Sequence, residues 1–255
     1  DPGILPGLRG WYRDHPADFI NDWGVTFDPR NADIGLPTTI PFVLFPRQRE
    51  WVEWVMERWA AREDGGSVKS RDMGLTWLAI SLASTLCLFR EGVAIGFGSR
   101  KAEYVDKLGA PKSIFWKGRE FIKRLPPEFT GAWDVSRDTT EMLIKFPQTG
   151  SVIQGEAGDG IGRGDRCTIY FVDESPFLER PQLVDAALSQ TTNCRIDIGT
   201  PNGMGNSFAR KRFGGKIPFF DMHWRHDPRK DEAWYAHQKA TLDPVVLAQE
   251  VDMSF

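Results

Sequence analysis

Long apolar segments are missing from this sequence, and its first residues do not form a basic stretch followed by an apolar one. A helix that crosses a membrane needs about 20 consecutive apolar residues, and a secretion signal needs the basic-then-apolar order. We therefore expect neither a membrane span nor a secretion signal, and we predict a soluble protein that works inside a cell.

Cysteine is also scarce. The chain has three cysteines, Cys87, Cys167 and Cys194, which are widely spaced and form no CxxC pair. Disulfide frameworks and zinc sites both use cysteines in paired patterns. The three thiols are therefore predicted to be reduced, and we assign them neither a metal nor a catalytic role.

A large charge excess is missing as well. The 255 residues carry a formal net charge of -3, with 26% charged and 41% hydrophobic residues. A protein that coats nucleic acid through its overall field would need a strong positive excess. The composition is that of a globular chain, and the length suits one large domain with a packed core.

Basic residues do gather locally. The segment 100–124 holds eight Lys or Arg against three Asp or Glu, and Arg210, Lys211, Arg212 and Lys216 form a second cluster. Such clusters can contact DNA phosphates without reading base sequence, although most charge runs are only solvated faces. Both interpretations stay open for each cluster.

Periodicity divides the chain into an N-terminal arm and one domain. Residues 1–40 are rich in Pro, Gly, Asp and Asn and are predicted to be irregular. Apolar spacing predicts helices over 47–62, 77–89, 99–108 and 181–191, a hairpin over 142–154, and strands over 93–97, 169–172, 195–198 and 219–224. Because helices alternate with short apolar strands over 41–255, we predict the α/β class, with a mostly parallel central sheet flanked by helices.

Two carboxylates follow one of the most apolar of these strands. Residues Ile169 to Val172 have the pattern of a buried strand, and Asp173 and Glu174 come directly after it. Ligands of open α/β sheets bind at the carboxyl ends of strands. There, Asp173 would hold a magnesium ion and Glu174 would polarise an attacking water. A strand that ends in Asp-Glu also occurs on ordinary surfaces, so a second element is needed.

The segment 67–76, which opens the helix at 77–89, is the candidate for that second element. Backbone N–H groups and the helix dipole bind phosphates at such a place. The segment departs from the GxxxxGK[ST] pattern, because Lys69 stands at the first glycine position and Leu75 at the lysine position. Gly74 and Thr76 fit the pattern, and the threonine could still bind magnesium.

The sequence leaves open which positively charged residue of this loop would contact the phosphates. Lys69 enters from the start of the loop and could reach the same phosphates as a lysine at its end, and Arg71 adds a second positive charge. The alternative is an ordinary helix start that is capped by Ser70 or Asp72.

The Lys-Ser-x-x-x-Gly-x-Thr order from Lys69 to Thr76 resembles the variant phosphate-binding loop, or Walker A motif, of phage terminase large subunits. Other segments follow in the order of that family. The segment 45–48 resembles its adenine-contacting Q motif, 160–164 its arginine-bearing loop, 169–174 its Walker B motif, and 199–203 its coupling motif. The ordered set, which covers roughly residues 40–255, carries the resemblance.

The resemblance implies a P-loop NTPase domain of the ASCE, RecA-like type that binds ATP and Mg²⁺. The nucleotide would contact Gln48, Lys69, Ser70, Arg71, Asp72, Met73, Gly74, Leu75 and Thr76. Thr76 and Asp173 would bind the metal, and Glu174, Arg71 and Arg163 would act in catalysis, with Arg163 serving as a finger in a neighbouring subunit's site. Thr200 and Asn202 would couple the loss of the γ-phosphate to the movement of DNA.

By the same resemblance, the protein would be an ATPase motor that translocates double-stranded DNA into a viral procapsid, in the host cytoplasm and without membrane contact. Its partners would be the DNA, the portal protein, the small terminase subunit and further copies of itself in a homo-oligomeric ring, a pentamer on the portal. Terminase large subunits continue into a nuclease domain, whereas this sequence ends at Phe255, so no nuclease activity is expected of it.

Two other functions share some of these features. A helicase with a similar core would use the same Q motif, carboxylates and threonine-containing motif, but it would need a second motor-like domain, for which no chain remains. A scaffold that binds DNA or the portal without hydrolysis would explain the departure at Leu75. The Asp173-Glu174 pair argues against the scaffold, because a site without hydrolysis needs no carboxylate to activate water.

Overall fold

The computed structural model describes residues 3–255, which contain one eight-stranded sheet and a separate two-stranded one. The strand order of the large sheet is β10 (Phe219–Met222), β3 (Gly65–Lys69), β9 (Arg195–Gly199), β8 (Ile169–Val172), β4 (Ala94–Ser99), β7 (Ser151–Ala157), β6 (Leu143–Phe146) and β5 (Thr139–Thr140). Neighbouring strands from β10 to β7 run parallel, and β6 pairs antiparallel with both β7 and β5. The predicted α/β class with a mostly parallel sheet is confirmed.

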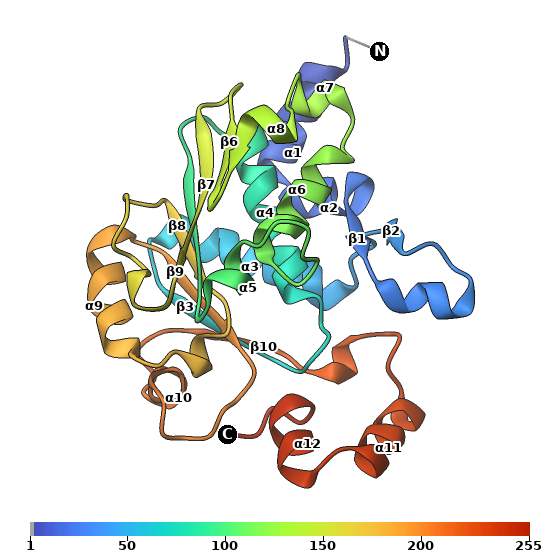
Figure 1. The fold of residues 1–255 in the computed structure, drawn as a ribbon, viewed down its shortest axis with the longest axis vertical. Helices are drawn as coiled ribbons and strands as arrows, with labels where there is room; N and C mark the ends of the chain where they lie inside the picture. Colours follow the sequence, from blue (N-terminus) through green and yellow to red (C-terminus); the bar gives the residue numbers. More distant parts are fainter. Residues whose placement is uncertain (1–2) are drawn as a thin grey trace.

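Helices cover both faces of this sheet (Figure 1). The helices α3 (Pro46–Ala61), α4 (Leu75–Phe89) and α6 (Ile114–Lys123) lie on one face, and α9 (Pro181–Thr191) lies on the other. Side chains of the strands alternate accordingly. In β8, Ile169 and Phe171 belong to the main core, whereas Tyr170 and Val172 pack into the smaller core beneath α9. Both faces of β8 are therefore buried, which explains its unbroken apolar run.

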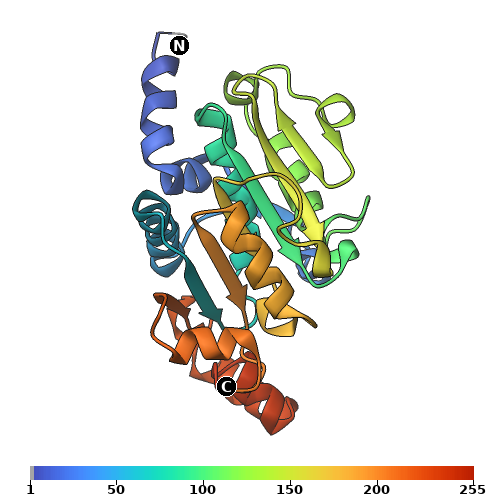
Figure 2. The ribbon, with the colours of Figure 1, turned by 90° about the vertical axis from the view of Figure 1, so that its left-hand side faces the viewer.

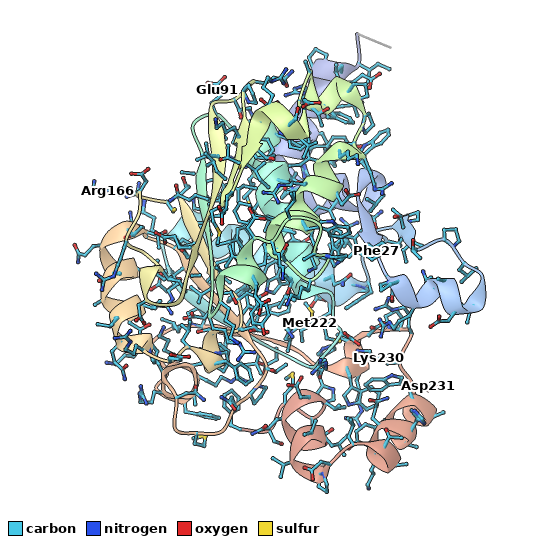
Figure 3. The ribbon with its side chains drawn as sticks, viewed as in Figure 1. Phe27, Glu91, Arg166, Met222, Lys230 and Asp231 are labelled. Carbon is cyan, nitrogen blue, oxygen red and sulfur yellow. The ribbon has the colours of Figure 1, made fainter. Side chains whose placement is uncertain are left out.

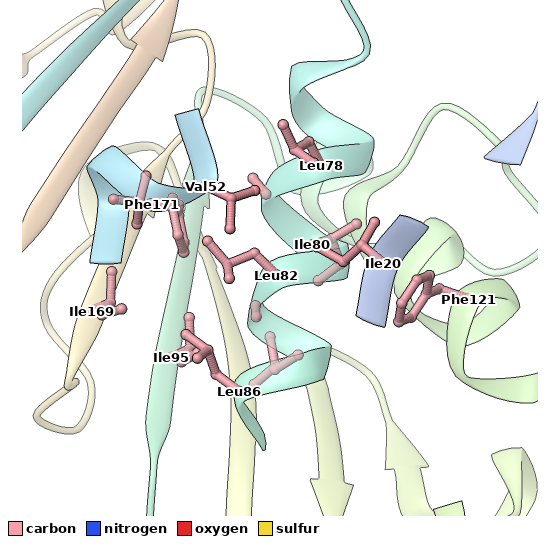
Figure 4. Packing of buried hydrophobic residues seen from close by; sticks show 14 of the residues in the cluster. Ile20, Val52, Leu78, Ile80, Leu82, Leu86, Ile95, Phe121, Ile169 and Phe171 are labelled. Carbon is pink, nitrogen blue, oxygen red and sulfur yellow. The ribbon is translucent and has the colours of Figure 1, made fainter. Parts of the chain in front are cut away.

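Helix α4 occupies the centre of the main core. Figure 4 shows its Leu86 close to Ile95 of β4, and its Ile80 close to Ile20 and Phe121 on the opposite side. The helix is thus enclosed between the sheet and other helices, and this packing fixes the position of its first turn.

Most of the predicted elements of the domain are present. The helices predicted at 47–62, 77–89 and 181–191, the hairpin at 142–154 and the four single strands correspond to α3, α4, α9, β6 with β7, and β4, β8, β9 and β10. The helix predicted at 99–108 is wrong in extent, because Ser99 still belongs to β4 and only α5 (Ala102–Val105) is helical. The helix ends at Val105, and the two carboxylate oxygens of the next residue, Asp106, each lie 2.7 Å from a guanidinium nitrogen of Arg119.

The irregular arm predicted at 1–40 is also wrong for the described residues. They form α1 (Leu5–Asp14), α2 (Pro16–Trp23), a hairpin of β1 (Val25–Phe27) with β2 (Thr39–Pro41), and the 3-10 turn η1 (Pro29–Ile34). Tyr12, Phe19 and Ile20 are buried in the main core. The prolines misled the prediction, because each of these two helices has a proline in its first turn, where proline starts a helix rather than breaking one.

The remaining elements are short. They are α7 (Pro127–Thr130), α8 (Val135–Asp138), η2 (Gly158–Gly160), η3 (Ser175–Phe177), α10 (Ser207–Phe213), η4 (Trp224–His226), α11 (Glu232–Thr241) and α12 (Pro244–Glu250). Figure 2 shows α11 and α12 at the end of the molecule opposite the N-terminus. There, Trp224, Leu247 and Val251 form a small core of their own. None of the helices in residues 3–255 combines the length and the apolar composition that a membrane span requires.

Candidate functional site

A cavity of about 660 Å³ opens at the carboxyl ends of the central parallel strands. Its walls come from the ends of β3, β4, β8 and β9, from the first turn of α4, and from α5, α6 and α12. Open α/β sheets bind their ligands at this edge, and small-molecule sites range from about 300 to 1,000 Å³. The cavity is therefore the first candidate for a ligand site.

The connection between β3 and α4 forms one wall of this cavity. Strand β3 continues to Lys69 and α4 begins at Leu75, so the loop is shorter than the predicted segment 67–76 and Lys69 stands on the strand. The backbone turns at Asp72 (φ 58°) and Gly74 (φ 71°), in the left-handed region that glycine adopts without strain. The turn brings the N-terminus of α4 to the cavity, and the first N–H groups of a helix have no partner within the helix.

Thr76, in the first turn of α4, meets Asp173 at the end of β8. The threonine hydroxyl donates a hydrogen bond of 2.9 Å to Asp173 Oδ2. The neighbouring Leu75 side chain belongs to the main core and is 1% exposed. A lysine at this position would bury its charge, so any cation that binds phosphate has to come from another part of the chain.

Glu174 follows Asp173 in a left-handed backbone conformation, with φ 54°. Its N–H donates to Asp173 Oδ1 at 3.0 Å, and its Oε2 accepts a hydrogen bond of 2.8 Å from Arg100 Nε. The Arg100 guanidinium lies 5.2 Å from the ring centroid of Tyr104 and 5.6 Å from that of Phe177. Arg100 belongs to no motif of the sequence, and in this arrangement it neutralises the carboxylate assigned to water activation.

Gln48 and Ser70 lie behind the loop and are not among the residues that line the cavity. Gln48 is buried, and its Nε2 donates to the Met73 carbonyl at 3.0 Å. The Ser70 hydroxyl donates to the Val251 carbonyl at 2.6 Å and accepts from the Trp224 N–H at 2.9 Å. Both side chains hold the loop in shape, and their predicted contacts with the nucleotide stay predictions.

The segment that follows β10 packs directly on the loop. The Arg71 N–H donates to the Glu250 carbonyl at 2.6 Å, and the Arg71 guanidinium lies 3.4 Å from Glu250 Oε2. Lys230 Nζ donates to the carbonyls of Arg71 at 2.9 Å and Asp72 at 3.3 Å, and burial lowers the pKa of this ammonium. Figure 3 labels Lys230 and Met222, the last residue of β10. Helix α12 and the segment before α11 therefore contact the loop that forms the cavity wall.

The predicted coupling segment touches the turn that carries Glu174. Thr200 is buried and lines the cavity, whereas the Asn202 side chain donates to the Pro176 carbonyl at 3.3 Å. Gly199 lies so close to the same turn that an added Cβ would stand 2.1 Å from Pro176 Cδ. Only glycine permits this approach, and the coupling role of Thr200 and Asn202 stays a prediction.

A cluster of four charged side chains, of which Arg195 and Asp197 on β9 are buried and Asp185 and Lys211 are partly exposed, braces this turn. Asp197 accepts hydrogen bonds from Arg195 at 2.7 Å, Lys211 at 2.9 Å and the Ser175 hydroxyl at 2.8 Å. Asp185 lies 2.6 Å from Arg195 and 2.8 Å from Lys211. Burial alone would raise the pKa of Asp197, yet the two cations lower it to about 2. No motif marks these residues, because they meet only in the folded sheet.

Arg163 is exposed and is not among the residues that line the cavity of its own chain. Its Nε donates to the Asp159 carbonyl at 3.0 Å. The surrounding loop is fixed by the Glu156 carboxylate, which accepts hydrogen bonds of 2.6 Å from the N–H groups of Gly162 and Gly164. An exposed arginine on a braced loop is what a finger for a neighbouring subunit requires, and that role stays a prediction.

Several cavity residues belong to no motif. They are Trp77, Ser99, Arg100, Tyr104, Lys112, Ile114, Lys117, Phe177 and Glu250. Five of them, three of which are basic, fall in the stretch 100–124, for which DNA contact and solvation were the two interpretations. The structure instead places Arg100, Lys112 and Lys117 at the cavity. Charge density was the only signal in the sequence that could have found them.

Thr76 and Asp173 form a fitting partial ligand set for Mg²⁺. In nucleotide sites Mg²⁺ binds one or two protein oxygens and completes its shell with phosphate oxygens and waters. Thr76 Oγ1 and Asp173 Oδ2 provide such a pair at the cavity. Within residues 3–255, no group of three or more His, Cys, Asp or Glu side chains is arranged to hold a metal. Binding of Mg²⁺ here would therefore depend on the phosphates of a ligand.

No protein-family model matches the sequence, and no curated protein matches it. Solved structures do match. The large terminase ATPase domain of a Thermus phage superposes with a TM-score of 0.57, over 80% of this chain and 93% of that one, at 17% identity. The chain has the fold of a large terminase ATPase domain.

A second terminase agrees with this assignment. The large terminase of a thermophilic bacteriophage, solved in complex with ADP, matches with a TM-score of 0.57 at 12% identity, over 82% of this chain and 52% of that one. The chain thus spans about half the length of that terminase. The terminase ATPase fold predicted from the order of the motifs is confirmed, and at these identities the likeness concerns the fold.

Proposed function

We propose that this chain hydrolyses ATP as the ATPase domain of a terminase-like motor that packages viral DNA. One observation carries the chemistry. Thr76 at the start of α4 and Asp173 at the end of β8 meet at 2.9 Å beside Glu174, in a cavity of about 660 Å³. The terminase ATPase fold supports a nucleotide as the ligand, because a solved terminase of this fold holds ADP.

In the proposed reaction a water molecule attacks the γ-phosphorus of ATP. The bond between that phosphorus and the oxygen bridging to the β-phosphate breaks, and ADP and inorganic phosphate leave. Glu174 accepts the proton of the attacking water, which it can do once its Oε2 has separated from Arg100. Mg²⁺, when bound by Thr76 and Asp173, supplies positive charge that offsets the negative charge of the phosphates.

The loop limits which groups can bind the phosphates. The N–H groups of Ser70 and Arg71 already donate to the carbonyls of Met222 and Glu250. The phosphates would therefore be bound by the N–H groups of 72–76, at the N-terminus of α4. Lys69 is favoured over Arg71 as the positively charged residue that contacts the phosphates from this loop, because the exposed Arg71 guanidinium already has the Glu250 carboxylate as a partner.

The motor itself extends this proposal beyond the single chain. Hydrolysis would drive double-stranded DNA into a procapsid in the host cytoplasm, in a ring of copies, by family resemblance five, that contacts the portal protein and the small terminase subunit. Arg163 would enter the site of a neighbouring copy, where such a cation speeds hydrolysis by several orders of magnitude. Arg210 and Lys216 stay candidates for DNA contact, whereas Lys211 is ion-paired with Asp185 and Asp197.

Magnesium-dependent phosphate release from ATP, measured over a range of protein concentrations, tests this function. Wild-type protein should release phosphate at a rate that rises faster than its concentration, because the Arg163 finger comes from another copy. Glu174→Gln should bind ATP but release no phosphate, and Lys69→Ala should lose ATP affinity. Wild-type protein that binds ATP without release would favour the scaffold, and unwinding of a forked duplex would favour the helicase.

A further inference from the structure

A lysine outside every motif faces the proposed nucleotide. Lys117, in the first turns of α6, lines the cavity together with Thr76 and Asp173. Its ammonium donates to the carbonyls of Pro111 and Lys112 at 2.8 Å, and to that of Ser113 at 3.4 Å. The side chain is therefore held at the cavity wall by neutral oxygens.

This ammonium lacks the counter-charge that a cation removed from water usually has. Buried charges in proteins are normally paired or bind an ion. Among residues 3–255, the hydrogen bonds of Lys117 go only to carbonyl oxygens. Burial lowers the pKa of Lys117 to about 8, and the carboxylate that opposes this effect is Asp173. Lys117, Asp173 and Thr76 all line this one cavity.

The lining of the cavity also contains a buried hydroxyl that has no hydrogen-bond partner among the described residues. Ser99, the last residue of β4, lines the cavity and is 1% exposed. In the described part of the chain, its Oγ has no hydrogen-bond partner. Buried polar groups are normally satisfied, so an oxygen-rich ligand suits both this hydroxyl and the Lys117 ammonium.

We propose that Lys117 binds the terminal phosphates of the nucleotide as a second cation, in addition to Lys69. This role rests on the proposed ATPase function. On binding a triphosphate, the Lys117 ammonium would replace hydrogen bonds to neutral carbonyl oxygens with hydrogen bonds to anionic phosphate oxygens. Hydrogen bonds between two charged groups are about twice as strong as those between neutral groups. Asp173 and Thr76 would hold a magnesium ion, which would offset the charge of the terminal phosphates, and Lys117 lines the same cavity. Lys117 therefore contacts the far end of the nucleotide rather than its adenosine.

Calorimetric titration with ATP, ADP and AMP in the presence of Mg²⁺ tests this role. Lys117→Met keeps the length of the side chain and removes its charge. It should weaken ATP binding about 10-fold or more, weaken ADP binding less, and leave AMP binding unchanged, since a hydrogen bond to a charged group contributes about 1.5–3 kcal/mol. Lys117→Arg should recover most of the ATP affinity. Lys145→Met removes the same charge from an exposed position on β6 and serves as the control.

Two results would overturn the role of Lys117. One is equal ATP affinity in wild-type protein and Lys117→Met. The other is a parallel loss of affinity for ATP, ADP and AMP with a lower melting temperature, because Lys117 would then only brace the turn at 111–113. The wild-type titration separates this failure from a failure of the proposed function, in which wild-type protein itself would bind no ATP.

Discussion

The carboxylate of Asp197 offers the most quantitative test of the structure. Asp197 is 1% exposed and accepts hydrogen bonds from Arg195, Lys211 and Ser175. Together with Asp185 the cluster contains two cations and two carboxylates, so it is electrically neutral. Asp197→Ala would leave one buried positive charge without compensation, which typically costs about 3–5 kcal/mol of stability.

Urea unfolding at pH 7, followed by circular dichroism, measures this cost. The matched control is Asp14→Ala, because Asp14 and its partner Arg13 are each about half exposed, and the unfolding free energy should stay almost unchanged. Ser175→Ala removes only the hydrogen bond to Asp197 and should cost about 1 kcal/mol. Because Ser175 directly follows Glu174, this variant should also lower kcat while the nucleotide affinity stays the same.

The same carboxylate predicts the response of stability to acid. The folded pKa of Asp197, about 2, lies below its ordinary value of 3.8. The contribution of Asp197 to the free energy of unfolding is therefore fully present above about pH 4 and is lost as the pH falls toward 2. The difference between the two pKa values corresponds to about 2 kcal/mol of stability. In Asp197→Asn, the free energy of unfolding should change less with pH between about 4 and 2 than it does in wild-type protein. Equal unfolding free energies for wild type and Asp197→Ala at pH 7 would refute the reasoning.

Two further changes probe the loop. Thr76→Val removes the hydroxyl that donates to Asp173 and should abolish magnesium-dependent phosphate release, whereas Thr76→Ser should retain it. Equal rates of phosphate release in wild-type protein and both variants would show that Thr76 is not part of the site. Gly74→Ala places a Cβ at φ 71°, 3.0 Å from Gln48 Nε2, and should lower both the melting temperature and the ATP affinity. Gly92→Ala, at φ 64° with no atom within 4 Å, carries the strain alone and should lower only the melting temperature.

The elements with strong local patterns could be predicted from the sequence. Helix α4 and strand β8 are apolar along nearly their whole length, because each is enclosed by other elements, and their bounds were found within a few residues. Helix α11 was missed, and none of its residues is buried, so it carries no apolar stripe that periodicity could detect. The N-terminal helices were missed because their prolines were taken as breakers rather than as first-turn residues.

By itself, the sequence determined where the candidate site lies along the chain. A loop that opens a helix and a strand that ends in two carboxylates are local patterns, and a parallel sheet brings Thr76 and Asp173 to the same edge. Only the tertiary structure decided which other side chains face that edge. It turned Gln48 away from the cavity and turned Arg100 and Lys117 toward it. The physical reason is that the direction of a side chain depends on the packing and register of elements far apart in the chain, whereas a motif records only residue types and their spacing.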